Sequence, residues 1–132
     1  MDMAVKSRAS KTDRLSAPGL RAFFSIADHW GLDKEERRTL LGSVPGSTFY
    51  KYVNDPESAR LSRDTLERIS HLIGIFKSIN VLLPRPEQAD AWVKRVNDAA
   101  LFKGRSALEF MLSGRFEDLI AVRHYLDAAR GW

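Results

Sequence analysis

An all-helical fold, built as a small helical bundle, is what the sequence predicts. Apolar residues recur every three or four positions along most of the chain, which is the spacing of one face of an α-helix. Glycine or proline follows most of these runs, and no segment alternates apolar and polar residues as a half-buried strand does. The 132 residues, 44% hydrophobic and 29% charged, have the composition of a globular chain that buries a core. A chain of this length forms one folded unit or two small subdomains that depend on one another.

The first helix is predicted to follow a basic arm. Residues 1–17 show no apolar periodicity and carry Lys or Arg at four positions, so we expect a flexible basic arm there. The apolar residues between Leu20 and Trp30 then recur at helical spacing, and Gly31 stands where a glycine commonly ends a helix. The pattern therefore predicts a helix that ends near residue 30.

Two short helices joined by a glycine-containing turn are predicted next. Asp33 and Glu36 have the spacing of a capping box and start the first of these helices. The turn ends at Gly46, and the second helix runs to Val53, with Phe49 and Val53 facing inward at a spacing of i, i+4. Such a helix-turn-helix can place its second helix in the major groove of DNA.

Four further helices complete the bundle. The first has the clearest apolar stripe and takes Ser62 as its N-cap, and Val96 in the second is expected to face inward. The four are predicted over residues 62–82, 86–97, 106–113 and 116–129. The segment after residue 83 is too short to hold a stable core alone, so we expect it to pack on the long helix, on a second copy or on a partner.

The charge balance and the lack of cysteine limit the classes of function. Lys and Arg number 21 against 17 Asp and Glu, and the net charge of +4 is concentrated in the first 20 residues. Any nucleic-acid footprint must then come from local clusters of cations. Without cysteine, the chain forms neither a disulfide nor a thiolate metal site. No apolar run is long enough for a secretory signal or a membrane span, so we expect a cytoplasmic protein.

Enzyme motifs do not stand out. The three histidines lie on separate predicted helices without the spacing of metal ligands. The glycine-containing segments lack the Gly-Lys-Ser/Thr of a phosphate-binding loop, and there is no nucleophile-elbow pattern. We therefore expect no catalytic residue, no metal ion and no cofactor.

The second helix of the helix-turn-helix offers candidate DNA contacts. Hydroxyl and ammonium groups suit phosphates, whereas a phenol and an amide can reach base edges. The candidate DNA-binding residues are Ser47, Thr48, Tyr50, Lys51 and Asn54. The alternative is that this helix only completes the bundle and that these side chains form a solvated face. The basic arm adds modest weight to DNA binding, because such arms follow the backbone or the minor groove of DNA.

The C-terminal segment carries a more distinctive pattern. An aromatic residue precedes Gly-x-Ser and Leu-Glu, a glycine precedes the last helix, and Tyr-Leu stands near the end of that helix. The residues that carry this pattern are Phe102, Gly104, Ser106, Leu108, Glu109, Gly114, Val122, Tyr125, Leu126 and Gly131. With these residues the segment resembles the toxin-binding domain of the Xre/MbcA/ParS antitoxin family. The Xre-type helix-turn-helix that usually precedes this domain is matched by Leu32, Leu40, Leu41, Gly42, Ser47, Thr48, Phe49 and Tyr50. Two departures are Ala107, where the family commonly has proline, and a turn at residues 43–46 that is one residue longer.

The resemblance implies the antitoxin of a type II toxin-antitoxin pair. It assigns a helix-turn-helix domain to residues 18–83 and a toxin-binding domain to residues 84–132. The implied partner is a RES-domain toxin, an enzyme that consumes NAD and whose active-site cleft the antitoxin obstructs, and the helix-turn-helix is implied to repress the operon. The expected toxin-binding residues are Arg123, Tyr125, Leu126, Arg130 and Trp132.

One alternative function and one assembly state complete the expectations. The alternative is a stand-alone helix-turn-helix transcriptional regulator whose C-terminal helices only dimerise. A homodimer is expected because operator half-sites are read by two-fold assemblies.

Overall fold

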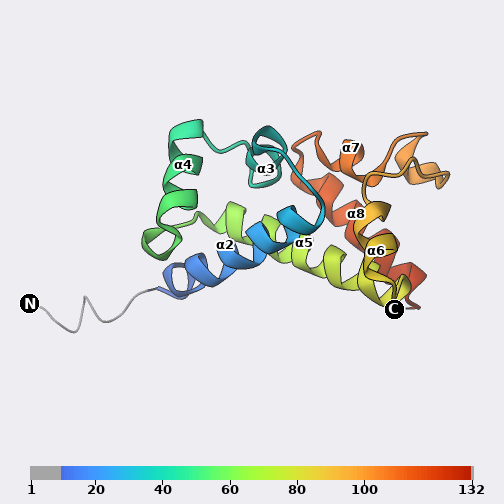
Figure 1. The fold of residues 1–132 in the computed structure, drawn as a ribbon, viewed down its shortest axis with the longest axis horizontal. Helices are drawn as coiled ribbons and strands as arrows, with labels where there is room; N and C mark the ends of the chain where they lie inside the picture. Colours follow the sequence, from blue (N-terminus) through green and yellow to red (C-terminus); the bar gives the residue numbers. More distant parts are fainter. Residues whose placement is uncertain (1–9, 132) are drawn as a thin grey trace, which may run out of the picture.

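The computed structural model describes residues 10–131, and within them the fold is all helical, as the sequence predicts (Figure 1). In chain order the elements are α2 (Lys11–His29), α3 (Lys34–Leu40), α4 (Gly46–Asn54), η1 (Pro56–Ser58), α5 (Arg63–Leu82), α6 (Pro86–Trp92), η2 (Ala100–Phe102), α7 (Ala107–Met111) and α8 (Phe116–Ala129). The extended pairing among the described residues is an isolated antiparallel bridge between Val96 and Ser106. No helix within residues 10–131 is both long and apolar enough to cross a membrane.

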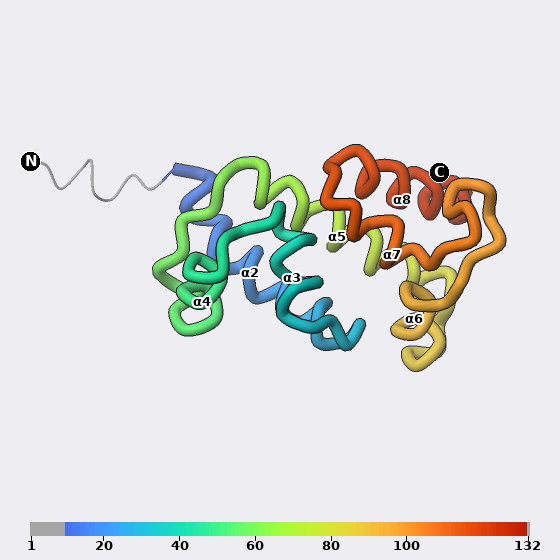
Figure 2. The backbone as a smooth tube through the Cα atoms, turned by 90° about the horizontal axis from the view of Figure 1, so that it is seen from above, coloured from blue at the N-terminus to red at the C-terminus, as the bar shows by residue number. Residues whose placement is uncertain are grey.

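Helix α5 is the spine of the molecule. It packs against α2 on one side and against α8 on another, and Ile69, Leu72, Ile75 and Ile79 along its length are almost completely buried. Figures 1 and 2 show α3 and α4 at one end of α5 and α6, α7 and α8 at the other. Because both ends bury apolar residues against the same helix, one continuous core serves the whole chain.

Helix α2 begins earlier than the sequence predicts. The Ser10 hydroxyl oxygen accepts a hydrogen bond of 3.0 Å from the Asp13 backbone N–H and caps a helix that starts at Lys11. The expected arm is therefore wrong for residues 11–17, and its first nine residues lie outside the described part of the chain. The sequence pattern does not reveal the start of α2, because the buried residue in this stretch is polar. Ser16 is buried, and its hydroxyl oxygen accepts a hydrogen bond of 3.0 Å from the Leu61 N–H. Pro18 lies inside the helix, where proline is rarely tolerated.

The turn between α3 and α4 is held by α3 itself. The capping box of Asp33 and Glu36 is confirmed, and Arg38 of α3 fixes the chain that follows. Arg38 Nε donates to the Val44 carbonyl at 2.9 Å and its Nη1 donates to Glu35 at 3.0 Å. The path through the turn also requires positive φ at Gly42 (106°) and Ser43 (59°).

Helix α4 does not bury Val53, which corrects the expected inward pair. Phe49 is buried and Tyr52 is half-buried against the core, whereas Val53 is 52% exposed. The core therefore lies between the directions of Phe49 and Tyr52 on this helix. At 100° per residue, Phe49 and Tyr52 each lie about 30° from that direction around the helix, whereas Val53 lies about 70° from it. Val53 therefore stays at the edge of the buried side, although it is four residues from Phe49.

Helix α6 ends at Trp92 instead of near residue 97, so the chain beyond it is free to turn back. Val96 is 64% exposed, contrary to the inward orientation that the sequence predicts. The Asn97 N–H donates to the Arg105 carbonyl at 3.1 Å, and the Leu108 N–H donates to the Val93 carbonyl at 2.8 Å. These two bonds close a loop that delivers Phe102, in η2, to the core.

Candidate functional site

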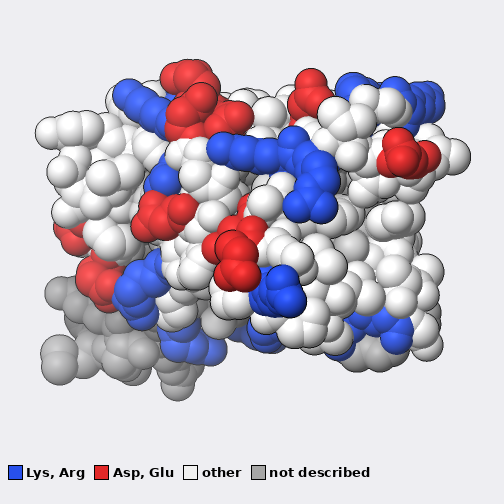
Figure 3. Space-filling view, turned by 45° about the vertical axis from the view of Figure 1, so that its right-hand side comes forward, with Lys and Arg blue, Asp and Glu red and all other residues white. Residues whose placement is uncertain are grey.

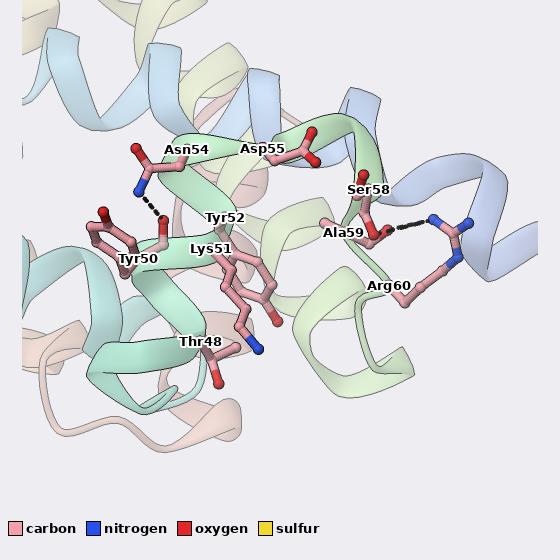
Figure 4. A pocket seen from close by; sticks show the side chains of 9 residues that line it. All are labelled: Thr48, Tyr50, Lys51, Tyr52, Asn54, Asp55, Ser58, Ala59 and Arg60. Carbon is pink, nitrogen blue, oxygen red and sulfur yellow. Dashed lines mark hydrogen bonds between the residues drawn. The ribbon is translucent and has the colours of Figure 1, made fainter.

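Helix α4 stands as a ridge between two hollows. The first, here the Arg60 hollow, has a volume of about 360 Å³ and is lined by Thr48, Tyr50, Lys51, Tyr52, Asn54, Asp55, Ser58, Ala59 and Arg60 (Figure 4). The second, here the Lys34 hollow, has a volume of about 430 Å³ and is lined by Leu32, Lys34, Arg37, Phe49, Tyr50, Val53 and Asn54. Tyr50 and Asn54 line both hollows, so these two residues form the crest of the ridge.

The five candidate DNA-binding residues share the outward side of α4, with Tyr50 and Asn54 on the crest. Ser47, Tyr50, Lys51 and Asn54 are exposed, Tyr50 by 67%, and Thr48 is half-buried. The Asn54 side-chain amide donates a hydrogen bond of 2.9 Å to the Tyr50 carbonyl, so one of its amide hydrogens is already used within the helix. The remaining polar groups face away from the core, in the arrangement that a helix needs to contact a nucleic-acid groove.

The two arginines of α3 are fixed within the molecule. Arg37 Nε donates to the Leu32 carbonyl and its Nη2 to Asp28, both at 2.9 Å, in the same way that Arg38 holds Val44 and Glu35. Arg38 therefore shapes the turn before α4, whereas Arg37 ties α3 to the end of α2 and the segment that follows it. On the face shown in Figure 3, Lys and Arg alternate with Asp and Glu in small groups, so this face carries no wide basic field.

Comparison with protein families identifies the family of this chain. Residues 9–74 match the model of an antitoxin Xre-like helix-turn-helix domain, and residues 78–131 match the model of the antitoxin Xre/MbcA/ParS C-terminal toxin-binding domain. The chain belongs to this antitoxin family. A relative from Sinorhizobium fredii, the uncharacterized protein y4oB, is 42% identical over 132 residues, covering 99% of each chain.

The two domains of the antitoxin meet inside α5. The matched ranges end at residue 74 and resume at residue 78, both within Arg63–Leu82, whereas the sequence pattern suggests a boundary at 83/84. Ser78 is buried in this stretch. A DNA-binding half and a toxin-binding half thus share one helix, with no linker between them.

Arg123 of α8 lies flat against α5 at the join. A Cβ atom added to Gly74 would lie 2.5 Å from Arg123 Cζ, so the absence of a side chain at Gly74 allows this approach. Arg123 Nη1 is 3.4 Å from the Ser70 carbonyl oxygen and 3.4 Å from His71 Nδ1. Burial and the positive charge of Arg123 lower the pKa of His71, with Glu67 opposing and His124 assisting this shift. A neutral His71 can accept the hydrogen bond from Arg123.

Arg130 extends the same surface toward the end of α8. Its Nη1 donates to Ser78 Oγ at 3.1 Å, and Asp127 Oδ1 lies 3.4 Å from the same hydroxyl. The helices leave a hollow of about 510 Å³ between them, here the α5–α8 hollow, lined by Gly74, Phe76, Lys77, Ser78, Asn80, Val81, Arg123, Asp127 and Arg130. Two of the expected toxin-binding residues, Arg123 and Arg130, are therefore brought together.

The other three expected toxin-binding residues are placed differently. Leu126 is 2% exposed and belongs to the core, so its expected role as a surface contact is corrected. Tyr125 is half-buried, with its ring centroid 5.3 Å from that of Phe102 in an edge-to-face contact. Both residues lie on the apolar side of α8 that packs against the core. A sequence pattern cannot distinguish such a side from one that binds a partner. Trp132 lies outside the described residues.

Several surface residues were missed by sequence reasoning. Arg60 follows η1 in a segment without periodicity, and Lys34 lies in the first turn of α3, where its neighbours are acidic. Lys77 interrupts the apolar run of α5, and this interruption was the signal that one side of α5 faces solvent. Val81, four residues further on the same side of the helix, is 58% exposed.

Proposed function

We propose that this antitoxin represses its own operon through α4 and inhibits a RES-domain toxin, which consumes NAD, by blocking its active site through the C-terminal domain. One observation carries the proposal. The crest of α4 and the α5–α8 hollow lie at opposite ends of one molecule (Figure 1). A bound toxin then need not displace DNA, and both partners can be held in the cytoplasm at once.

The DNA-binding part rests on the crest of α4. Tyr50 and Asn54 occupy its highest positions, where a phenol and an amide can meet base edges. Ser47, Thr48 and Lys51 offer hydroxyl and ammonium groups for the phosphates on either side. These assignments sort the five residues into those that read sequence and those that fix position.

The toxin-binding part rests on the α5–α8 hollow. Its lining carries three cations, Lys77, Arg123 and Arg130, against one carboxylate, Asp127. It therefore fits a partner segment that presents a carboxylate next to apolar side chains. Arginine in a largely apolar recess is typical of residues that dominate binding energy in interfaces. Inhibition is steric and requires no reaction in the antitoxin and no cofactor.

A homodimer is the third part of the proposal. An apolar groove of about 310 Å³ follows α2 and α5 and is lined by Leu15, Pro18, Gly19, Leu66, Ile69, Ser70 and Ile73. Leu15 is 47% exposed there, and Ser70 is the one polar residue in the lining. Closing this groove against a second copy would bury apolar surface and give the two-fold pair that an operator with two half-sites requires.

Co-expression with the product of the adjacent open reading frame tests the proposed function. We expect the neighbour to be toxic alone, to deplete NAD, and to be neutralised by and copurified with the antitoxin. Lys77→Glu and Arg130→Gln are expected to weaken the complex by at least about tenfold, because each removes a cation from a partly desolvated contact. Arg95→Ala, which removes an exposed cation outside this hollow, is the matched control.

Two results would contradict the proposal. A neighbour that is harmless alone, or that is toxic but does not copurify with this chain, would leave the stand-alone regulator as the better description. A complex that Arg95→Ala weakens as much as Lys77→Glu does would remove the α5–α8 hollow from the interface.

A further inference from the structure

We propose that Arg60, which lies in the helix-turn-helix domain but outside its two motif helices α3 and α4, positions this protein on DNA by binding a backbone phosphate, and that Asp13 holds the Arg60 guanidinium until a phosphate displaces it. This inference rests on the proposed DNA binding of α4. It adds a phosphate-binding residue and a competing carboxylate that neither the sequence pattern nor the family domains assign.

The geometry begins with the Arg60 hollow. Its walls are α4 on one side and the Ser58–Arg60 segment on the other, so a phosphate that enters the hollow lies between them. Figure 4 shows Lys51 and Thr48 extending from α4 on the side of the hollow, with Arg60 on the opposite wall. The Arg60 guanidinium itself is turned toward α2 and away from Lys51 (Figure 4), so it must swing toward the hollow to join Lys51 and Thr48 as a donor to a phosphate diester.

Tyr52 adds a further donor to the same wall. It is half-buried, and burial raises the pKa of its phenol above the usual 10.0. The phenol is therefore protonated and neutral throughout the physiological pH range, and it can donate a hydrogen bond without repelling a phosphate. Asp55 is the carboxylate in this lining, and Figure 4 shows it at the other end of the hollow from the Lys51 ammonium group.

In the free protein Arg60 is only loosely held. Its guanidinium Nε is 3.9 Å from an Asp13 carboxylate oxygen, and Nη1 donates to the Ala59 carbonyl at 3.1 Å. The side chains of Arg60 and Asp13 are 64% and 36% exposed, and ion pairs this accessible to water contribute little. A phosphate can thus replace the carboxylate at small cost, and Asp13 acts as a weak competitor on α2.

The Lys34 hollow on the other side of α4 is electrostatically different. Lys34 is flanked in sequence by Asp33 and Glu35, with Glu36 one position further, and Arg37 in that hollow is already paired with Asp28. Glu57, the acidic residue of η1 nearest Arg60 in sequence, is instead paired with Arg21. Charge therefore favours a backbone phosphate on the Arg60 side, and Lys34 supplies a matched control.

The test uses the full chain and two duplexes of equal length. One duplex carries the DNA directly upstream of the gene for this protein, and the other has a scrambled sequence of the same composition. The dissociation constant is measured over a range of salt concentrations for wild type, Arg60→Ala, Asp13→Asn and Lys34→Ala. Thermal unfolding of each variant checks that the fold is retained.

We expect Arg60→Ala to weaken binding to both duplexes and to reduce the slope of log K against log salt by about 1, as the loss of one phosphate contact does. Asp13→Asn is expected to tighten binding about two- to fivefold, the range corresponding to an exposed ion pair. Lys34→Ala should leave the slope within about 0.3 of wild type, well below the value for one phosphate.

The outcomes separate this inference from the function on which it rests. A wild type that binds the upstream duplex, together with an unchanged slope in Arg60→Ala or weaker binding in Asp13→Asn, overturns the role of Arg60 and leaves DNA binding by α4 intact. An equal loss of slope in Lys34→Ala overturns the assignment of the phosphate to the Arg60 side. A wild type that binds neither duplex overturns both proposals.

Discussion

Asp118 shows how a single buried carboxylate fixes the start of a helix. It is 6% exposed and lies in the first turn of α8, where it accepts hydrogen bonds from Ser113 Oγ at 2.6 Å and from Arg115 Nε at 3.3 Å. Burial on its own would raise the pKa of Asp118, but the hydrogen bonds from Ser113 and Arg115 and the positive charges of Arg115 and Arg105 outweigh it and lower this pKa. The carboxylate therefore joins the turn after α7 to α8.

Replacing Asp118 with alanine is expected to destabilise the protein by about 1 to 3 kcal/mol, because Ser113 loses a buried acceptor and the first turn of α8 loses a favourable negative charge. The measurement is the free energy of unfolding in urea at neutral pH. Asp98→Ala, which removes an exposed carboxylate from the loop before η2, is the control and should change stability by less than about 0.5 kcal/mol. Equal effects of the two substitutions would contradict this role for Asp118.

The same carboxylate gives the stability a defined pH dependence. Because the pKa of Asp118 is lower in the folded than in the unfolded chain, the stabilisation is complete above the usual value of 3.8. It is lost as the pH falls through the lowered pKa of the folded state, where the carboxylate becomes protonated in both states. The loss of stability in acid should therefore be smaller in Asp118→Ala than in wild type.

At the scale of elements, Phe102 organises the toxin-binding half. It is completely buried, and its ring centroid lies 6.2 Å from that of Trp92, 5.7 Å from Phe110 and 5.3 Å from Tyr125. These contacts join η2 to α6, α7 and α8, none of which buries enough surface alone. Edge-to-face ring pairs of this kind add to the stabilisation that apolar burial provides.

We expect Phe102→Ala to cost about 3 to 5 kcal/mol, which is typical of removing a large buried ring. Val96→Ala, in the same loop but at a position 64% exposed, should cost less than about 0.5 kcal/mol. The two variants are compared by urea unfolding followed by circular dichroism. If Phe102→Ala is as stable as Val96→Ala, η2 is not the centre of this half.

Helices with caps and uninterrupted apolar stripes could be predicted from the sequence, and those with neither could not. The capping box at Asp33, the Ser62 N-cap of α5 and the range of α8 were all predicted and are confirmed. The start of α2 was missed because a buried serine and Pro18 replace the apolar signal there. The position of Phe102 depends on the hydrogen bond between Leu108 and Val93, which are distant along the chain.

The candidate sites were predictable to a smaller degree, because exposure depends on tertiary packing. The five α4 residues form a crest because Phe49 and Tyr52 set the direction of the core, and the periodicity of the helix is enough to place the others outward. On α8, the sequence could not separate Leu126, which completes the core, from Arg130, which lies at its edge. Arg60 and Asp13 meet only through the packing of α2 beside η1.

At the scale of the whole molecule, the DNA-binding and toxin-binding halves are expected to unfold together. The family boundary falls within α5, and Leu72, Ile75 and Ile79 on either side of it are buried in one core. Unfolding either half would expose the α5 residues that it covers and remove neighbours from the other half. Small domains with a single core usually show one cooperative transition.

Two tryptophans allow the halves to be observed separately. Trp30 lies at the end of α2 and is 2% exposed, and Trp92 ends α6. In a Trp92→Phe, Trp132→Phe variant, Trp30 is the only tryptophan. Its fluorescence should report the same fraction of unfolded protein at each urea concentration as circular dichroism of that variant. Fluorescence of Trp92 in a Trp30→Phe, Trp132→Phe variant should likewise match its own circular dichroism. Among the described residues the Trp30 indole N–H has no hydrogen-bond partner, so phenylalanine there removes an unsatisfied donor and should be tolerated.

A destabilising change in one half then tests whether the other half responds. We introduce Phe102→Ala into the variant whose only tryptophan is Trp30. It is expected to lower the urea midpoint of the Trp30 fluorescence, although Phe102 and Trp30 belong to different family domains. The shift should match the one seen by circular dichroism, because a shared core transmits the loss through α5. A Trp30 midpoint that stays at its original value while circular dichroism shows an earlier partial loss would mean that the helix-turn-helix half folds independently. If the probes agree, unfolding of the toxin-binding half also unfolds the helix-turn-helix half through the shared helix α5, and DNA binding is lost with it.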